Sequence, residues 1–343
     1  MKALVKTQQG PGHLELLDVE EPSCGPGQAK VEVKASGICG TDIHILNDVY
    51  PYRAPVILGH EYSGTVVETG PGVQSAKVGD RVAVLTSIGE CCGTCRFCRD
   101  GHFSLCIAKL CHGEQLDGGF AKYSVVREEL ATPLPDNVSF DVGALTEPLA
   151  CCVQAVERAD IKPRDVVLVS GPGPIGLLVA SLAKLQGAKV VVCGLSRDAR
   201  RLQVAKEMGA DIALAVDQGD LISLVKDETD GYGADVVFET AGVEASVKQC
   251  LNALAVGGTY VQIALFGEPA ISVNANMFVN KHVRLLGNYG MTWESWGRTL
   301  KILSGSGVDF SKVITARMPL SAWEAAFEAV QHKTALKVLL YPE

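Results

Sequence analysis

The pattern of hydrophobic and polar positions changes character near residue 145. Before that point, short segments that alternate or run apolar, at 31–34, 64–68 and 80–84, are separated by Gly-Pro, Pro-Gly and Gly-Asp pairs. Such segments are typical of short strands joined by tight turns. We therefore predict an antiparallel, barrel-like β domain for the first part of the chain.

After residue 145, apolar strands alternate with helices. A buried strand is predicted at 166–169, and the apolar residues between Ile175 and Leu185 recur at helical spacing until Gly187. Further strands are predicted at 190–192, 235–239, 260–264 and 283–286, with a helix near 200–208. This alternation predicts an α/β domain whose parallel sheet is covered by helices on both faces.

The tail differs from both parts. Ser321-Ala-Trp-Glu324 has the pattern of a capping box that opens a helix, and 336–340 is predicted as a last strand. We expect the tail to return to the first domain. The predicted domains are therefore 1–148 together with 290–343, and 149–289.

Composition and charge narrow the class of protein. The chain has 343 residues, of which 47% are hydrophobic, and this is enough for two domains with cores of their own. A formal charge of −8 without runs of like charge argues against a nucleic-acid binder. No apolar run reaches the ~18 residues that span a bilayer, and the start lacks a signal peptide's apolar region. We expect a cytoplasmic protein with no membrane partner.

Clustered cysteines predict a structural metal site. Cys92, Cys95, Cys98 and Cys106 follow one another at spacings of three, three and eight. Two short C-x-x-C steps and a longer arm can direct four sulfurs at one zinc ion with no open position. Cys91 could compete with Cys92 as the first ligand, and free or redox-active thiols are the alternative interpretation. The other isolated or paired cysteines are expected to be small core residues: Cys24, Cys111, Cys151, Cys152, Cys193 and Cys250.

A second group of candidate ligands lies in two nearby motifs and one distant one. Cys39 opens the run C-G-T-D-x-H, and His60 and Glu61 stand in the run G-H-E. A further carboxylate, Glu147, is at the predicted domain junction. A cysteine, a histidine and a carboxylate give zinc only three ligands and leave one position for water or substrate, as in catalytic sites.

A glycine-rich loop predicts a dinucleotide site. Gly171-Pro-Gly173-Pro174-Ile175-Gly176 has the form G-x-G-x-x-G and lies between a predicted strand and helix. The glycines allow a tight turn, close approach of a pyrophosphate and close packing of helix on strand, and the helix N-terminus faces the phosphates.

The residues after the next strand favour NADP, with NAD as the alternative. NAD enzymes usually place an acidic residue there, ~20 residues after the loop, to bind the ribose hydroxyls. Gly194 occupies the position, and Ser196 and Arg197 offer a hydroxyl and a guanidinium to a 2′-phosphate. An alternative is that Ser196 and Arg197 merely start a helix.

Together these motifs resemble those of the zinc-dependent medium-chain alcohol dehydrogenases, in the expected order and over essentially the whole chain. The resemblance is carried by G-H-E-x2-G-x5-G from Gly59 to Gly70, by C-G-T-D-x-H, by the four-cysteine lobe and by the glycine loop. It implies a GroES-like antiparallel β-barrel catalytic domain beside a doubly wound Rossmann domain, and a homodimer or homotetramer. The most similar subfamilies are the polyol (sorbitol-like) and L-threonine 3-dehydrogenases.

The resemblance also implies roles for individual residues. Cys39, His60 and either Glu61 or Glu147 would bind the catalytic zinc, so the chain would hold two zinc ions, and Asp42 would orient the His60 ring. Arg201 would reach the adenosine end of the cofactor. The loops after later strands, 240–242, 263–265 and 288–289, would lie on the nicotinamide side. From these loops we select Ile263, Leu265 and Asn288 as cofactor residues, and Asn288 and Tyr289, together with Glu147, as substrate residues.

The chemistry that follows is oxidation of a secondary alcohol. Zinc would lower the pKa of the substrate hydroxyl, and a hydride would pass to the nicotinamide. Thr41 would accept the proton and pass it through the cofactor ribose to His44, unless His44 is only a surface histidine.

For the substrate we favour a polyol or related vicinal hydroxy compound. Glu147 fits the polyol branch, whereas Asn288 replaces an arginine of sorbitol-type enzymes. The last third of the chain is closer to the threonine type, so L-threonine is the alternative substrate. A cofactor-binding or sensing protein without turnover is the alternative from another class.

Overall fold

The computed structural model describes residues 1–267 and 270–343, and these divide into two compact units. The first unit comprises Met1–Ala150, Met291–Gly307 and Ile314–Glu343, and the second comprises Cys151–Gly290 and Val308–Val313. The division falls within helix α4 (Thr146–Ala159). The tail therefore contributes to both units, since its residues 308–313 group with the second.

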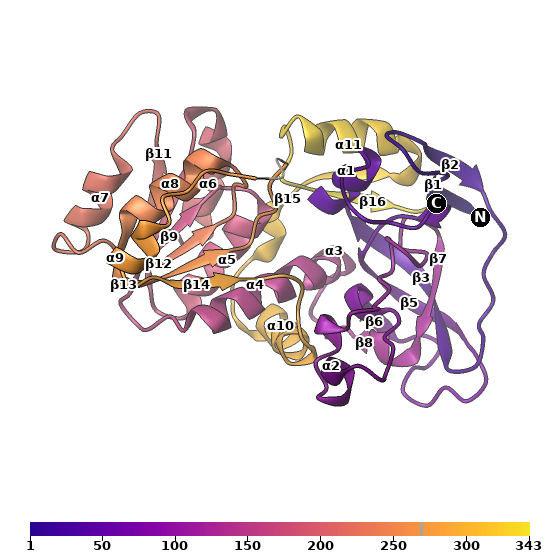
Figure 1. Cartoon of the computed structure of the whole chain (residues 1–343). Helices are drawn as coiled ribbons and strands as arrows, with labels where there is room; N and C mark the ends of the chain where they lie inside the picture. The colour runs from indigo at the N-terminus through magenta and orange to yellow at the C-terminus, as the bar shows by residue number, and fades with distance from the viewer. Residues whose placement is uncertain (268–269) are drawn as a thin grey trace. The chain divides into compact units, whose positions relative to one another are not determined.

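The first unit is built on two sheets (Figure 1). In the smaller sheet the strand order is β2 (Leu14–Asp18), β1 (Lys2–Lys6), β4 (Val56–Ile57). The larger sheet has the order β15 (Ile314–Pro319), β16 (Lys337–Tyr341), β3 (Gln28–Gly37), β5 (Glu61–Thr69), β6 (Arg81–Val84), β8 (Ala131–Pro133), and β7 (Tyr123–Arg127) also pairs with β3. All neighbours are antiparallel except β15 and β16. The predicted antiparallel domain is confirmed.

Strand β3 shows how the sequence builds this unit. Its residues alternate between buried and half-buried along most of the strand, because successive side chains point to opposite faces and one face packs on the core. Three helices of the unit are short: α1 (Gly40–Leu46), α2 (Arg96–Arg99) and α3 (Phe140–Ala144). Two longer helices come from the tail: α10 (Trp293–Gly305) and α11 (Trp323–Gln331).

The predicted capping box at Ser321 is wrong. Ser321 lies within a 3-10 turn, Leu320–Ala322, and α11 begins only at Trp323 with Ala322 as its N-cap and no side-chain cap. The tight turn delays the helix by one residue beyond the position that the motif requires. Glu324 is consequently the second helical residue and cannot complete the box.

The second unit contains a six-stranded parallel sheet in the order β11 (Ile212–Ala215), β10 (Lys189–Gly194), β9 (Val166–Ser170), β12 (Ala234–Glu239), β13 (Leu254–Gln262), β14 (Arg284–Gly287). Helices lie on both sides of this sheet in Figure 1: α5 (Pro174–Leu185), α6 (Ala199–Glu207), α7 (Leu221–Asp227), α8 (Glu244–Ala253) and α9 (Asn276–Asn280). The predicted doubly wound α/β fold is confirmed, and all five β9 side chains are buried at its centre. The strand order reverses between β9 and β12, which is where such sheets bind ligands.

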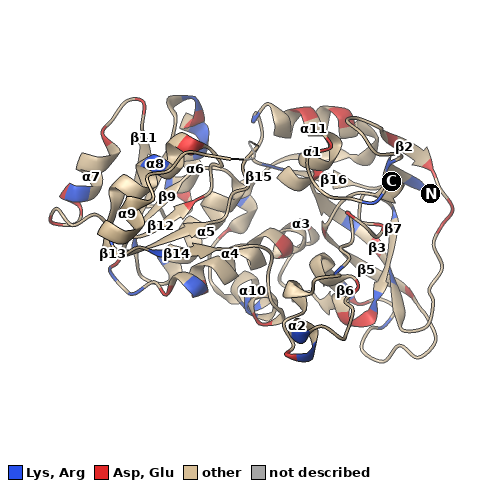
Figure 2. Cartoon of the chain, viewed as in Figure 1, with Lys and Arg blue, Asp and Glu red and all other residues tan. Residues whose placement is uncertain are grey.

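Charge is mixed over both units. Figure 2 shows acidic and basic residues interspersed along the ribbon of each unit. Within the described residues, no helix combines the length and the apolar character that crossing a bilayer requires.

Candidate active site and metal centres

The four-cysteine motif forms one compact cluster. The sulfurs of Cys92, Cys95, Cys98 and Cys106 all lie within 4.8 Å of one another. Cys92 Sγ is 3.6 Å from Cys106 Sγ and 3.9 Å from Cys98 Sγ. A tetrahedral ion with Zn–S bonds of about 2.3 Å separates its sulfurs by about 3.8 Å, so these spacings fit zinc. They are far too long for disulfides.

The neighbouring thiol has a different environment. Cys91 Sγ donates to the Phe103 carbonyl at 3.6 Å and is not a member of the cluster. Backbone N–H groups of Cys95 and Thr94 lower the pKa of Cys92 to about 6, which favours the thiolate form that metals bind. The remaining cysteines form no disulfides: Cys111, Cys152, Cys193 and Cys250 are buried, and Cys24 and Cys151 are half-buried.

The second cluster joins Cys39, His60 and Glu61 in the first unit, with one ligand atom from each within 4.8 Å of the others. Cys39 lies between the end of β3 and the start of α1, and Glu61 is the first residue of β5, a strand that pairs with β3. Gly59 has a φ of +90°, and a Cβ there would lie 2.6 Å from the Phe120 ring. Only glycine therefore permits the turn that presents His60.

Asp42 supports two of these ligands. Its carboxylate is fully buried; Oδ2 accepts from the Cys39 backbone N–H at 2.8 Å, and Oδ1 faces His60 Nδ1 at 3.5 Å. Thr41 lies beside the cysteine, with its Oγ1 3.7 Å from Cys39 Sγ. His44, three residues further along α1, is half-buried. The structure thus places Thr41, Asp42 and His44 on one short helix that Cys39 caps, and it brings Thr41 and Asp42 to the cluster.

The Glu61 carboxylate is held by a buried lysine that the sequence analysis missed. Lys337 Nζ, on β16, donates to Glu61 Oε1 at 2.8 Å, to Oε2 at 2.6 Å and to the Ile38 carbonyl at 2.9 Å. Gly37 makes room for the carboxylate, since a Cβ there would lie 2.3 Å from Glu61 Oε2. The signal that could have found this contact is a lysine directly before the apolar residues 338–340.

Glu147 lies outside the three-residue group, although it is half-buried in the same unit. Burial raises the pKa of Glu147 to about 7; the charge of His60 opposes this rise and that of Glu61 adds to it. The structure therefore joins Glu61 to Cys39 and His60, and leaves Glu147 as a nearby second carboxylate.

The donor set fits zinc on its own chemistry. Sulfur, imidazole nitrogen and carboxylate oxygen are the ligands of catalytic zinc sites. Burial by itself would lower the pKa of His60, but the charges of Asp42 and Cys39 outweigh burial and raise that pKa well above its usual value. The surroundings thus favour positive charge at this point, as a cation site requires. Asp42 would orient the imidazole from behind.

The glycine loop has the geometry of a pyrophosphate site. Gly171 has a φ of +107°, and a Cβ at Gly176 would lie 2.0 Å from the Gly171 carbonyl oxygen. Gly173 instead borders open space and is the N-cap of α5, with Pro174 at the first helical position and Ile175 after it. The first and third glycines thus close the turn, and the second leaves space beside the helix N-terminus for phosphate.

The residues predicted to bind the adenosine end of the cofactor have neighbours that the sequence did not reveal. Gly194 ends β10, and a Cβ there would lie 2.7 Å from the Pro172 ring, so the usual acidic side chain has no room. Ser196 binds the carboxylate of Asp217, a residue the sequence analysis did not select. Arg197 is exposed. Arg201 is half-buried on α6, and burial lowers its pKa.

Asn288 forms a contact within the second unit that the sequence analysis did not foresee. Its Nδ2 donates to the Cys151 carbonyl at 3.1 Å, which ties the end of β14 to α4. Ile263 is half-buried, and Leu265 and Tyr289 are 51% and 55% exposed. The side chains of these three residues are therefore accessible to a ligand.

A buried glutamate organises the loops after β12 and β13. Glu239 accepts from the backbone N–H groups of Ala241 at 2.9 Å and Gly242 at 3.0 Å, from Ser246 Oγ at 2.8 Å and from Gln262 Nε2 at 2.7 Å. It thereby joins two of the predicted cofactor loops. No sequence motif marks this role, because an acidic residue at the end of a strand is common.

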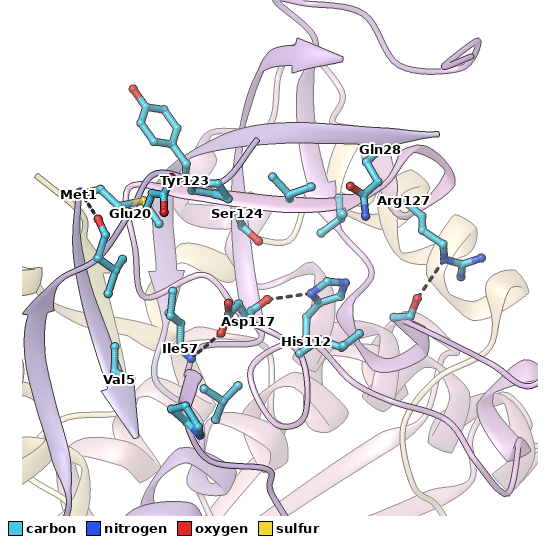
Figure 3. Close-up of a pocket in the computed structure, with 18 of the residues that line it drawn as sticks. Met1, Val5, Glu20, Gln28, Ile57, His112, Asp117, Tyr123, Ser124 and Arg127 are labelled. Carbon is cyan, nitrogen blue, oxygen red and sulfur yellow. Dashed lines mark hydrogen bonds between the residues drawn. The ribbon is translucent and has the colours of Figure 1, made fainter. Parts of the chain in front are cut away.

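A cavity of about 450 Å³ lies elsewhere in the first unit (Figure 3). It is lined by apolar residues and by a few polar groups that already have protein partners. His112 Nδ1 bonds to the Asp117 carbonyl at 2.8 Å, and Asp117 Oδ1 accepts from the Ile57 N–H at 2.9 Å. Ser124 Oγ bonds to Tyr62 at 2.8 Å. Because these polar groups are already hydrogen-bonded within the protein, they do not indicate which ligand the cavity would bind, and we assign it no function.

Comparison with known proteins gives the class. The alcohol dehydrogenase GroES-like domain matches residues 25–136, and the zinc-binding dehydrogenase domain matches residues 174–305. A sorbitol dehydrogenase of Halalkalibacterium halodurans is 42% identical over 100% of this chain and 99% of its own length. An L-threonine 3-dehydrogenase of Pyrococcus horikoshii is 36% identical over 99% of this chain and 98% of its own length.

Solved structures agree. A zinc-binding dehydrogenase of Sinorhizobium meliloti bound to NADP has a TM-score of 0.92 at 32% identity and covers 99% of both chains. An alcohol dehydrogenase of Escherichia coli complexed with NADH has a TM-score of 0.89 at 27% identity, again over 99% of both chains. The chain therefore belongs to the zinc-dependent medium-chain alcohol dehydrogenase family. It is a zinc-containing, NAD(P)-dependent dehydrogenase, and the non-catalytic alternative is set aside.

Proposed function

We propose that this enzyme transfers a hydride between a polyol, or a related vicinal secondary alcohol, and NADP. The observation that carries the proposal is the group formed by the half-buried Cys39 and the buried His60 and Glu61, a three-ligand set that leaves a zinc ion one position for a substrate hydroxyl. The 42% identity to a sorbitol dehydrogenase over the whole chain supports the polyol class.

The protein's own residues have distinct tasks in this reaction. Cys39, His60 and Glu61 would hold the zinc, and Glu147 is positioned as a second carboxylate that can exchange with Glu61. When bound, zinc makes the substrate hydroxyl more acidic and the nicotinamide accepts the hydride. Thr41 Oγ1 would accept a hydrogen bond from the substrate hydroxyl, and His44, one turn along α1, would exchange a proton with solvent.

Preference for NADP is supported by the adenosine end of the second unit. Gly194 has no carboxylate to repel a 2′-phosphate, and the Pro172 ring leaves no room for an acidic side chain at that position. Ser196 and the exposed Arg197 supply donors of the kinds that bind phosphate. Arg201 lies further along α6, and the relatives solved with NADP and with NADH show that the fold accommodates either cofactor.

A substrate and cofactor panel tests the proposal. Sorbitol, xylitol, 2,3-butanediol, L-threonine and 2-propanol are each assayed with NAD and NADP, with a Cys39→Ser preparation as the control for contaminating activity. We expect the highest kcat/KM for a polyol with NADP. Higher kcat/KM for L-threonine than for every polyol would contradict the substrate assignment.

Oxidation of L-threonine is the second candidate. Its support is the 36% identity to a threonine dehydrogenase over nearly the whole chain. Glu147 favours the polyol branch instead, and the same panel decides between the two.

We also propose that the enzyme is a homodimer or homotetramer. Strand β14 is at the edge of the parallel sheet, where Leu285 is 54% exposed. An open strand edge with an apolar side chain can pair with the same edge of a second copy. Light scattering on a sizing column measures the mass, and a monomer at micromolar concentration would contradict the proposal.

A further inference from the structure

Ser196, one of the two residues assigned above to the 2′-phosphate, is already bound to a carboxylate. Its backbone N–H donates to Asp217 Oδ1 at 2.8 Å, and its hydroxyl donates to Asp217 Oδ2. Both donors that Ser196 can offer therefore reach the same acid.

The sheet explains why these residues meet. Strands β10 and β11 are parallel neighbours, and Gly194 is in register with Ala215. The backbone N–H of Val216 donates to the Gly194 carbonyl at 2.9 Å, which holds the two strand ends together. Ser196 follows one strand by two residues and Asp217 follows the other by two, so their side chains meet at the carboxyl edge of the sheet.

Asp217 brings an acid to a region where the usual acid is excluded. A side chain at Gly194 would collide with the Pro172 ring. The hydrogen bonds from Ser196, with a smaller contribution from the charge of Arg197, lower the pKa of Asp217 below its usual value. The carboxylate is thus ionised at neutral pH and faces the donors that a 2′-phosphate would use.

We propose that Asp217 is a specificity-determining residue that competes with the 2′-phosphate of NADP for Ser196. The phosphate has to displace the carboxylate or lie beside it, and both outcomes weaken NADP binding relative to NAD. Arg197 acts in the opposite sense, as a cation available to the phosphate. The balance between Asp217 and Arg197 sets the NADP-to-NAD ratio. This inference rests on the proposed assignment of the 2′-phosphate to Ser196 and Arg197.

Substitutions of Asp217 separate this role from a purely structural one. Asp217→Asn keeps the shape and one acceptor for Ser196 but removes the charge, and Asp217→Ala removes both. The matched control is Asp220→Asn, which makes the same change of charge three residues away; the Asp220 carboxylate accepts from Ile222 and Ser223 at the start of α7 instead. A structural role would shift thermal stability and weaken both cofactors equally.

The measurement compares adenosine 2′,5′-bisphosphate with AMP by calorimetric titration, and NADP with NAD by kcat/KM. We expect Asp217→Asn and Asp217→Ala to bind the bisphosphate at least about tenfold more tightly than the wild type does, while their affinity for AMP is unchanged. The ratio of kcat/KM for NADP to kcat/KM for NAD should rise by the same factor. The Asp220→Asn control should leave both ratios unchanged. Unchanged or lower bisphosphate affinity in both Asp217 variants overturns the inference.

Arg197→Leu shows which claim has failed in that case. If this variant weakens the bisphosphate selectively while the Asp217 variants have no effect, the 2′-phosphate assignment holds and only the role of Asp217 is wrong. If neither Arg197→Leu nor the Asp217 variants change the bisphosphate-to-AMP ratio, the NADP site itself is wrongly assigned and the inference falls with it.

Discussion

At the scale of single residues, Lys337 stands out as a charged side chain buried in an apolar strand. Its side chain is buried among apolar neighbours on β16, and its ammonium binds both oxygens of the fully buried Glu61. Burying either charge alone is costly, whereas the hydrogen-bonded pair compensates much of that cost. The lysine therefore keeps a carboxylate in place beside Cys39 and His60.

Removal of this lysine should destabilise the metal-free protein. Lys337→Met leaves Glu61 buried without its cation, at a cost of about 3–5 kcal/mol in the free energy of unfolding. The double variant Lys337→Met/Glu61→Gln should recover most of this loss, because the unpaired charge is gone. Urea unfolding of zinc-stripped protein measures both changes. Equal stability of the single and double variants would show that the ion pair is not the cause.

At the scale of elements, the proposed adenosine site depends on two turns that constrain one another. The Pro172 ring in the glycine loop occupies the space beside Gly194 at the end of β10, at 2.7 Å from a Cβ built there. A proline ring cannot rotate away as a flexible side chain can. The absence of an acid at 194 is therefore coupled to the proline at 172.

This coupling predicts a non-additive pair of substitutions. Gly194→Asp alone should weaken both NAD and NADP, because the loop must shift to admit the side chain. Pro172→Ala/Gly194→Asp should restore NAD and change the kcat/KM ratio toward NAD by about tenfold or more, since an acid there binds the ribose hydroxyls and repels a 2′-phosphate. Additive effects of the two substitutions on kcat/KM would contradict the coupling.

Asp211 connects three elements of the second unit and predicts an effect of acid. Asp211 directly precedes β11. Its carboxylate accepts from Lys184 Nζ, near the end of α5, at 2.7 and 2.8 Å, and from the backbone N–H of Val190 on β10 at 2.8 Å. Burial by itself would raise the pKa of Asp211, but these donors outweigh burial and lower it.

Because the folded-state pKa of Asp211 is the lower one, its contribution to stability is present above the unfolded-state pKa of about 3.9 and is lost as pH falls through the folded value. Relative to wild type, Asp211→Asn should be less stable by about 1 kcal/mol at pH 7, and this difference should shrink below about pH 4. Urea unfolding at several pH values measures it. The exposed Asp227→Asn is the control, and a pH-independent difference for Asp211→Asn would contradict the explanation.

At the scale of the whole molecule, local patterns were enough to predict the fold class. The change of hydrophobic period near residue 145 separates an antiparallel part from a parallel one, and the strand at 166–169 and the helix after it are found within a few residues of their observed bounds. Strand β11 was not predicted, although its four residues, Ile212–Ala215, are all apolar. A run this short does not distinguish a strand from a helix segment by its periodicity, and at the sheet edge its side chains are only half-buried. Ser321 failed as a cap because a preceding 3-10 turn shifts the helix start.

The candidate site was predictable where its residues lie close together in sequence. The four cysteines, and His60 with Glu61, stand in short motifs whose spacing reflects metal geometry. Lys337 and Asp217 were missed because their partners are 276 and 21 residues away, and only the folded sheets bring them together. The order of preference between Glu61 and Glu147 likewise needed the structure, which places Glu61 with Cys39 and His60.

The central claim is that one zinc ion binds at Cys39, His60 and Glu61 and is required for turnover, while a second binds at the four cysteines. Zinc content and alcohol oxidation are measured together on the wild type, Cys39→Ser and the matched control Cys92→Ser. We predict two zinc ions per wild-type chain, one in each variant, and turnover lost in Cys39→Ser but kept by the folded fraction of Cys92→Ser. A Cys39→Ser protein that retains two zinc ions, or that loses one and turns over at the wild-type rate, would contradict the account.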